Sequence, residues 1–157
     1  MSTNGSERFE PRVLVLCCLY CAYAAADVAG TLRRSYPECV RVMRVPCTGR
    51  VDAIDLLKAF EAGADGVLVV GCVDGQCHFK EGNRRGRRTA RSVQEMLEKV
   101  GVGAERLQFH GITAAMGSQF AEIVTAAVER FRALGPSPVK RPSCDRDATA
   151  AMEKSEG

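Results

Sequence analysis

Hydrophobic residues form four short apolar runs along the chain. Two of them, Val13–Cys17 and Gly66–Gly71, are apolar at nearly every position, as expected for strands buried on both faces of a sheet. The other two, Val40–Val45 and Leu107–Ile112, are interrupted by polar residues, which edge strands tolerate. The pattern therefore predicts four strands, with the two continuous ones in the middle of the sheet.

Each predicted strand is followed by a segment in which apolar residues recur at the spacing of an amphipathic helix. The second helix should begin after Asp52, a residue suited to an N-cap, and the third should cover residues 86–100. The fourth should cover residues 116–134, before Gly135. The predicted inward positions are Ala25, Val28, Ala29 and Leu32; Ile54, Leu57 and Phe60; Ala90, Val93, Met96, Leu97 and Val100; and Phe120, Ile123, Val124, Ala127, Val128 and Phe131.

Strands that alternate with helices predict an α/β fold, with a parallel sheet covered by helices on both faces. Placing the continuous strands in the middle gives a small four-stranded sheet of flavodoxin-like order 2-1-3-4. In such sheets, ligands bind beyond the carboxyl ends of the strands, at the point between strands one and three. We expect one α/β domain over residues 11–135, with disordered ends over residues 1–10 and 136–157.

The composition narrows the functional class only slightly. A chain of 157 residues with a net charge of +3 suits one domain and carries no strong overall field. The longest uncharged stretch, Val13–Ala26, is shorter than the roughly 18 residues that a membrane span requires. It resembles the apolar part of a signal peptide, but Glu7 and Glu10 balance the nearby arginines, so no positive leading region precedes it. We therefore predict a cytoplasmic protein.

Five of the eight cysteines follow predicted strands. Cys18 and Cys21 follow the first strand, Cys47 the second, and Cys72 and Cys77 the third. In the order 2-1-3-4 these strand ends are neighbours, so the five thiols should meet at one edge of the sheet. Thiolates are soft ligands that select iron–sulfur clusters, zinc or copper. The pattern predicts a metal centre in a reducing compartment rather than a set of disulfides.

The spacing alone leaves several kinds of site open. Cys18-x-x-Cys21 and Cys72-x4-Cys77 use spacings that also occur in plant-type 2Fe–2S ferredoxins, where they are contiguous. Such a cluster takes four thiolates, and the sequence does not decide which four of the five candidates, Cys47 included, would bind it. Structural zinc, a thiol–disulfide switch built on Cys18 and Cys21, and simple burial of small apolar side chains are the alternatives.

The remaining cysteines and the two histidines fit a metal site less well. Cys17 should point away from Cys18 and pack in the core, because neighbouring strand residues face opposite sides. Cys39 lies in a turn, and Cys144 lies in the tail as a free thiol. His78 follows Cys77 and is either a hydrogen-bond donor near the site or a loop residue, whereas His110 is predicted to be structural.

A basic run, Lys80–Arg91, lies directly after the third predicted strand and its two cysteines. It has six cationic residues against Glu81 alone, at the start of a helix, where the helix dipole disfavours cations. We predict a docking surface for an acidic partner; RNA is less favoured, since no aromatic residues interleave with the charges. No phosphate-binding loop and no nucleophile motif is present in the sequence. We therefore do not expect the chain to be catalytic by itself.

Several motifs together resemble the delta (iron–sulfur) subunit family of methyl-viologen-reducing hydrogenase. They are Cys18-Leu-Tyr-Cys21, Arg44-Val-Pro-Cys47-Thr-Gly-Arg50, Gly63-Ala-Asp-Gly66-Val-Leu-Val-Val-Gly71-Cys72, and Gly75-Gln-Cys77-His78. The resemblance implies a 2Fe–2S cluster held by four of Cys18, Cys21, Cys47, Cys72 and Cys77. It further implies electron transfer, in anaerobic metabolism, from a hydrogenase or formate dehydrogenase type donor to the flavin-bearing subunit of heterodisulfide reductase. Cys17 and the long basic tail depart from the family pattern.

Overall fold

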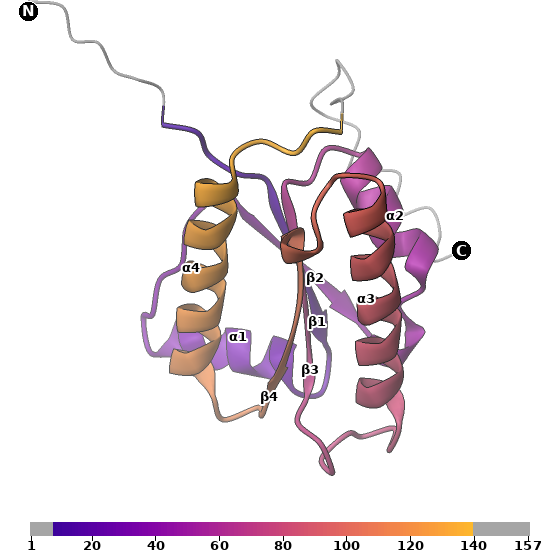
Figure 1. The fold of residues 1–157 in the computed structure, drawn as a ribbon. Coiled ribbons are helices and arrows are strands. Elements are labelled where there is room, and N and C mark those ends of the chain that lie inside the picture. Colours follow the sequence, from indigo (N-terminus) through magenta and orange to yellow (C-terminus); the bar gives the residue numbers. More distant parts are fainter. Residues whose placement is uncertain (1–7, 140–157) are drawn as a thin grey trace, which may run out of the picture.

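The computed structural model describes residues 8–139, and its sheet has the predicted architecture (Figure 1). All four strands are parallel, in the order β2-β1-β3-β4. The strands are β1 Val13–Cys18, β2 Val40–Val45, β3 Gly66–Cys72 and β4 Leu107–Ile112. The α-helices are α1 Ala22–Thr31, α2 Ala53–Glu61, α3 Gly82–Lys99 and α4 Gly117–Leu134. Two short 3-10 helices are η1 Thr48–Arg50 and η2 Ala104–Arg106. The predicted fold class and strand order are confirmed. The predicted domain limits and disordered ends stay predictions, because residues 1–7 and 140–157 lie outside the described residues.

Helices cover both faces of the sheet, with α1 and α4 on one side and α2 and α3 on the other (Figure 1). The side chains of β1 alternate between these layers: Val13, Val15 and Cys17 pack with α1 and α4, and Leu16 packs with α2 and α3. Every residue of β3 is buried, in agreement with its continuous apolar run. The two continuous apolar strands, β1 and β3, therefore form the centre of the molecule.

Some of the predicted inward faces are wrong. Helix α2 buries Leu56, Ala59 and Phe60, whereas Ile54 is 63% exposed, because residues one position off this stripe point about 100° away around the helix. Leu32 and Val100 are exposed because each lies just past the last residue of its helix, as a C-cap. Met96 is also largely exposed. Helix α3 begins at Gly82 rather than at residue 86, which places the first part of the basic run on its opening turns.

Hydrogen bonds link charged residues that precede three of the strands, at the amino edge of the sheet. Asp65, fully buried before β3, accepts hydrogen bonds from the backbone amides of Arg12 at 2.8 Å and Ser137 at 2.8 Å. Arg106, buried before β4, donates to the backbone carbonyl of Asp65 at 3.0 Å. Its other hydrogen bonds reach the carbonyls of Val102, Leu134, Gly135 and Pro136. This network attaches the end of α4 to the starts of the strands.

Candidate metal centre

The opposite, carboxyl edge of the sheet carries the five cysteines that follow strands. Cys18 and Cys72 are the last residues of β1 and β3, which are paired neighbours in the sheet. Cys21 is the N-cap of α1, and Cys47 is the N-cap of η1, just past β2. Cys77 lies in the loop between β3 and α3. The parallel topology thus places at one edge five residues that are widely separated in the sequence.

Three of these thiols form a compact buried group. The sulfurs of Cys18, Cys21 and Cys72 all lie within 4.8 Å of one another. The Cys72 Sγ is 3.0 Å from Cys21 Sγ and 3.9 Å from Cys18 Sγ, and all three residues are free thiols rather than disulfide partners. Three thiols converging from two strands and a helix start are a soft ligand set of the kind that binds iron–sulfur clusters or zinc.

Cys47 and Cys77 form a second pair beside this group. The thiol of Cys47 is near enough to interact electrostatically with that of Cys77, and it interacts with that of Cys18 in the same way. Both sulfurs face the backbone of Gly82: a Cβ at this position would overlap the sulfur of Cys47 and lie 3.3 Å from that of Cys77. Only glycine allows the first turn of α3 to approach the two thiols this closely. The structure therefore brings all five predicted residues to one place, three in one compact group and two next to it.

Backbone amides point at several of these sulfurs. The amide of Gly49 donates to Cys47 Sγ at 3.4 Å, and the amides of Tyr20 and Cys21 lie close to the thiol of Cys18. A hydrogen bond from Cys21, together with these amides, lowers the pKa of Cys18 below its usual value. The pKa of Cys21 is raised, first by the same hydrogen bond with Cys18 and second by burial. Burial is the main cause of the raised pKa of Cys72 and of Cys47. Thiols that interact this closely titrate as a group rather than as independent residues.

The other predicted positions lie elsewhere. Cys17 faces the layer of α1 and α4 and is fully buried, and burial raises its pKa to about 12. Cys39 is half-buried at the far, amino edge of the sheet, and Cys144 lies outside the described residues. His110 hydrogen-bonds Gln108 at 3.0 Å within β4. The backbone amide of His78 donates to Cys72, while its ring stacks on Tyr20.

Asn83 supports the site, a role that the sequence analysis did not predict. This residue is 1% exposed, and its Nδ2 donates to the carbonyl oxygen of Cys72 at 3.1 Å and to Asp74 at 3.2 Å. It thereby fixes the end of β3 to the start of α3 across the loop that carries Cys77. Gly82-Asn83 is part of the sequence pattern that resembles the delta subunit family, but the pattern alone assigns Asn83 no role, and the predicted helix began only at residue 86.

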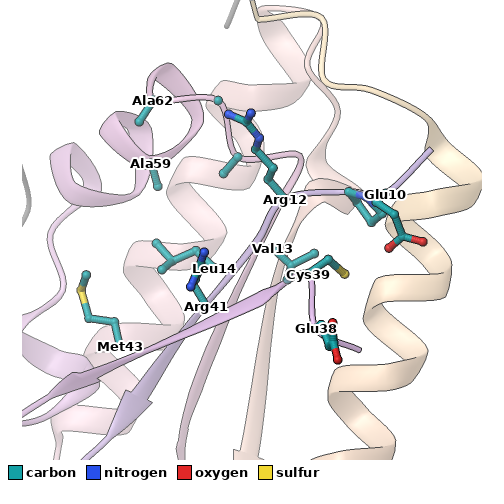
Figure 2. Close-up of a pocket in the computed structure, with 13 residues that line it drawn as sticks. Glu10, Arg12, Val13, Leu14, Glu38, Cys39, Arg41, Met43, Ala59 and Ala62 are labelled. Atoms are coloured by element: carbon teal, nitrogen blue, oxygen red, sulfur yellow. The ribbon is translucent and has the colours of Figure 1, made fainter. Parts of the chain in front are cut away.

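A hollow lies at the amino edge of the sheet, far from the cysteine cluster. Its volume is about 430 Å³, and it lies between the starts of β1 and β2 and the end of α2 (Figure 2). Among its lining residues only Cys39 carries a thiol, next to side chains of mixed charge that include Glu10, Arg12 and Arg41. This hollow therefore offers no ligand set comparable to that of the carboxyl edge.

Among the described residues, no helix combines the length and the apolar character needed to cross a membrane.

The sequence matches the family described as methyl-viologen-reducing hydrogenase, delta subunit, over residues 13–135. The chain belongs to this delta subunit family. The match covers the whole sheet and all four helices, and it includes the five cysteines of the carboxyl edge. The predicted resemblance is confirmed.

Relatives of the delta subunit family include proteins named for iron–sulfur content. The chain is 43% identical to an iron-sulfur subunit of the F420-non-reducing hydrogenase of Archaeoglobus profundus, over 87% of this chain and 99% of that protein. It is 38% identical to the vhu iron-sulfur subunit of the F420-non-reducing hydrogenase of Methanocaldococcus jannaschii, over 83% of this chain and 98% of that one. It is also 36% identical to part of a ferredoxin:CoB-CoM heterodisulfide reductase protein of Methanosarcina mazei, where the match takes up 83% of this chain but only 17% of that longer protein.

Proposed function

We propose that this chain is an electron-transfer subunit that carries a 2Fe–2S cluster at the carboxyl edge of its sheet. The observation that carries the proposal is the convergence of five thiols from three neighbouring strand ends, with the sulfurs of Cys18, Cys21 and Cys72 within 4.8 Å of one another. The names of relatives as iron-sulfur subunits support the same class of cofactor. In this proposal the chain passes electrons between partner proteins and does not itself transform a substrate.

The residues present fit such a cofactor. A 2Fe–2S cluster requires four thiolates, and Cys18, Cys21 and Cys72 supply three at one point. Cys47 is the best candidate for the fourth, because it is buried and lies near Cys18, whereas Cys77 is half-exposed and in a loop. When bound, the cluster would supply a one-electron couple. The chain's own part is to exclude water by burying the thiols and to direct backbone amides at sulfur, which tunes the potential of such centres.

The partners that we propose are a hydrogenase or formate dehydrogenase type electron donor and a flavin-bearing heterodisulfide reductase type subunit as acceptor. The match within the Methanosarcina mazei protein supports the second of these. There, a segment similar to this chain forms part of one polypeptide of a heterodisulfide reductase. Two functions joined in one polypeptide in one organism are expected to work side by side when they are encoded as separate chains.

Anaerobic purification with iron and sulfide analysis tests the cofactor. We expect two iron and two acid-labile sulfide per chain, as the 2Fe–2S composition requires, and an S = 1/2 EPR signal after reduction with dithionite. A colourless protein with one zinc per chain would instead make the chain a zinc-stabilised interaction module. A metal-free protein that cycles between Cys18–Cys21 dithiol and disulfide, and that tolerates replacement of Cys47 and Cys72, would make it a thiol switch.

A further inference from the structure

A cleft of about 420 Å³ opens beside the thiol cluster. It is lined by Pro46, Cys47, Gly49, Arg50, Phe79, Glu81, Gly82 and Arg85. Two of these residues belong to the cluster region itself, since Cys47 is one of the five thiols and Gly82 contacts its sulfur. The cleft is therefore a place where another molecule could come within contact distance of the proposed cofactor site without displacing any strand or helix.

The charge at the rim of this cleft is positive. Arg50 and Arg85 are exposed, and neither makes an ion pair within residues 8–139. The acidic lining residue, Glu81, already lies 3.6 Å from Arg84. Arg88 adds a further exposed positive charge one turn along α3 from Arg85. The two lining arginines thus lie on different segments of the cleft, η1 and α3, and neither is paired with a carboxylate of the described chain.

The cleft and the surface beside it also carry exposed apolar side chains. Phe79, which lines the cleft, is 50% exposed and packs edge-on against Tyr20, with ring centroids 5.7 Å apart. Tyr20 is 48% exposed and stacks on His78 at 3.9 Å, and its neighbour Leu19 is exposed as well. Exposed aromatic side chains next to arginine are typical of the centre of protein interfaces. Here they come from the loops after β1 and β3, the same two strands and loops that carry four of the five thiols.

We propose that this cleft binds an acidic segment of a partner protein with which the chain exchanges electrons. A carboxylate of the partner lies between Arg50 and Arg85, and an adjacent apolar side chain packs against Phe79 and Pro46. The proposal rests on the proposed electron-transfer function and adds to it the place and the chemistry of docking. The proposal reduces the predicted docking surface, Lys80–Arg91, to Arg85, because Arg85 is the one cation of that run that lines the cleft. Arg84 and Arg87 are already paired with acidic side chains.

The same features argue against a nucleic acid as the occupant. Single-stranded nucleic acids need aromatic faces that are free to stack on bases. In this structure Tyr20 and His78 already cover one face of each other, and Phe79 lies roughly perpendicular to both rings. The lining arginines also flank one compact cleft, rather than marking a track for successive phosphates. A protein segment with one or two carboxylates fits this arrangement better.

The test uses the cofactor-loaded, full-length chain and the flavin-bearing heterodisulfide reductase type subunit of the same organism as the probe. Binding is measured by calorimetry at low and at physiological salt. We expect the double variant R50E/R85E to weaken binding about 30-fold or more at low salt, with a flatter salt dependence. Phe79→Ala should weaken binding about 10-fold. The control R34E/R41E makes the same charge change away from the cleft and should alter binding less than about 3-fold.

Each outcome decides the proposal. Equal binding by R50E/R85E and by the control would overturn it, as would a loaded wild-type chain that does not bind the probe at all. Tighter binding of a 12-nucleotide single-stranded RNA, lost in the same variant, would assign the cleft to nucleic acid instead. Iron and sulfide are measured on every variant, so a failure of the cofactor is seen separately. A chain without iron whose binding still depends on Arg50 and Arg85 would refute the proposed function and keep the docking site.

Discussion

The two edges of the sheet handle polar and reactive groups in opposite ways. At the amino edge, the buried Asp65 and Arg106 hydrogen-bond to backbone groups of distant segments. At the carboxyl edge, Cys18, Cys21 and Cys72 contact mainly one another. The first arrangement uses its hydrogen-bonding capacity to hold the chain together. The second leaves a concentrated set of ligands whose partners, in the described chain, are chiefly other thiols. The two ends of the same strands thus differ: the amino ends are joined by hydrogen bonds that stabilise the fold, and the carboxyl ends carry the thiols that we propose as cofactor ligands.

The largest expected effect comes from removing a thiol at the carboxyl edge. Cys72→Ser should abolish iron binding, because Cys72 contacts both Cys18 and Cys21 and its loss leaves the compact group without its shared member. Iron and sulfide per chain, measured after anaerobic purification, check this. Cys39→Ser is the matched control at the amino edge and should keep full iron content. Full iron in Cys72→Ser would show that Cys72 is not a ligand and that the other four thiols of the carboxyl edge suffice.

The next largest effect should come from the amino edge and should concern stability alone. Arg106→Met leaves the buried carbonyls of Asp65 and Gly135 without their donor, and removes the bonds to Val102, Leu134 and Pro136 as well. We expect the free energy of unfolding, measured by urea denaturation, to fall by about 3–5 kcal/mol.

Two measurements sharpen that result. Arg130→Met removes an exposed ion pair with Glu105 and should cost less than about 1 kcal/mol. Iron per folded chain should stay unchanged in Arg106→Met, if the two edges have separate roles. A loss of iron at a temperature where the variant is still folded would show that the edges are coupled.

Gly82→Ala should give a smaller effect, confined to the carboxyl edge. A methyl group there would overlap Cys47 Sγ and crowd Cys77, so either the first turn of α3 or the two thiols must move. We expect a loss of about 1–3 kcal/mol in unfolding free energy together with reduced iron content. Gly30→Ala is the control, since a Cβ at that position in α1 meets nothing within 4 Å. It should stabilise the chain by about 0.5–1 kcal/mol and keep all its iron.

The sequence predicted the carboxyl edge better than the amino edge, for physical reasons. Cys18 and Cys72 could be placed because they follow apolar runs, and the order of the strands follows from which runs are continuous. Asp65 and Arg106 left no comparable signal: each is an isolated charged residue before a strand, and its partners are backbone atoms that only the folded chain brings near.

Details within the carboxyl edge were also beyond the sequence. The grouping of the five thiols into three and two depends on how closely η1 and α3 approach each other, which packing at Gly82 and Gly86 decides. The stacking of Tyr20 on His78 depends on the conformations of two loops. Periodicity likewise could not decide which apolar residues of α2 face the sheet, because Ile54 and Leu57 also have helical spacing. Only the fit against the sheet selects Leu56 and Ala59, together with Phe60.

The smallest expected effect is a pH dependence that belongs to neither edge. His110 lies in β4, between the two, and burial lowers its pKa below the usual value. The folded chain therefore keeps the imidazole neutral, while the unfolded chain takes up a proton as the pH falls through about 6.5. The contribution of the neutral His110 to the free energy of unfolding is complete above that pH and is lost as the pH falls below it. Thermal unfolding of the wild type and of His110→Gln between pH 8 and pH 5.5 measures this. The wild type should lose more stability on acidification than the variant, which has no group to titrate there; parallel curves would show that His110 carries none of the pH dependence of the fold.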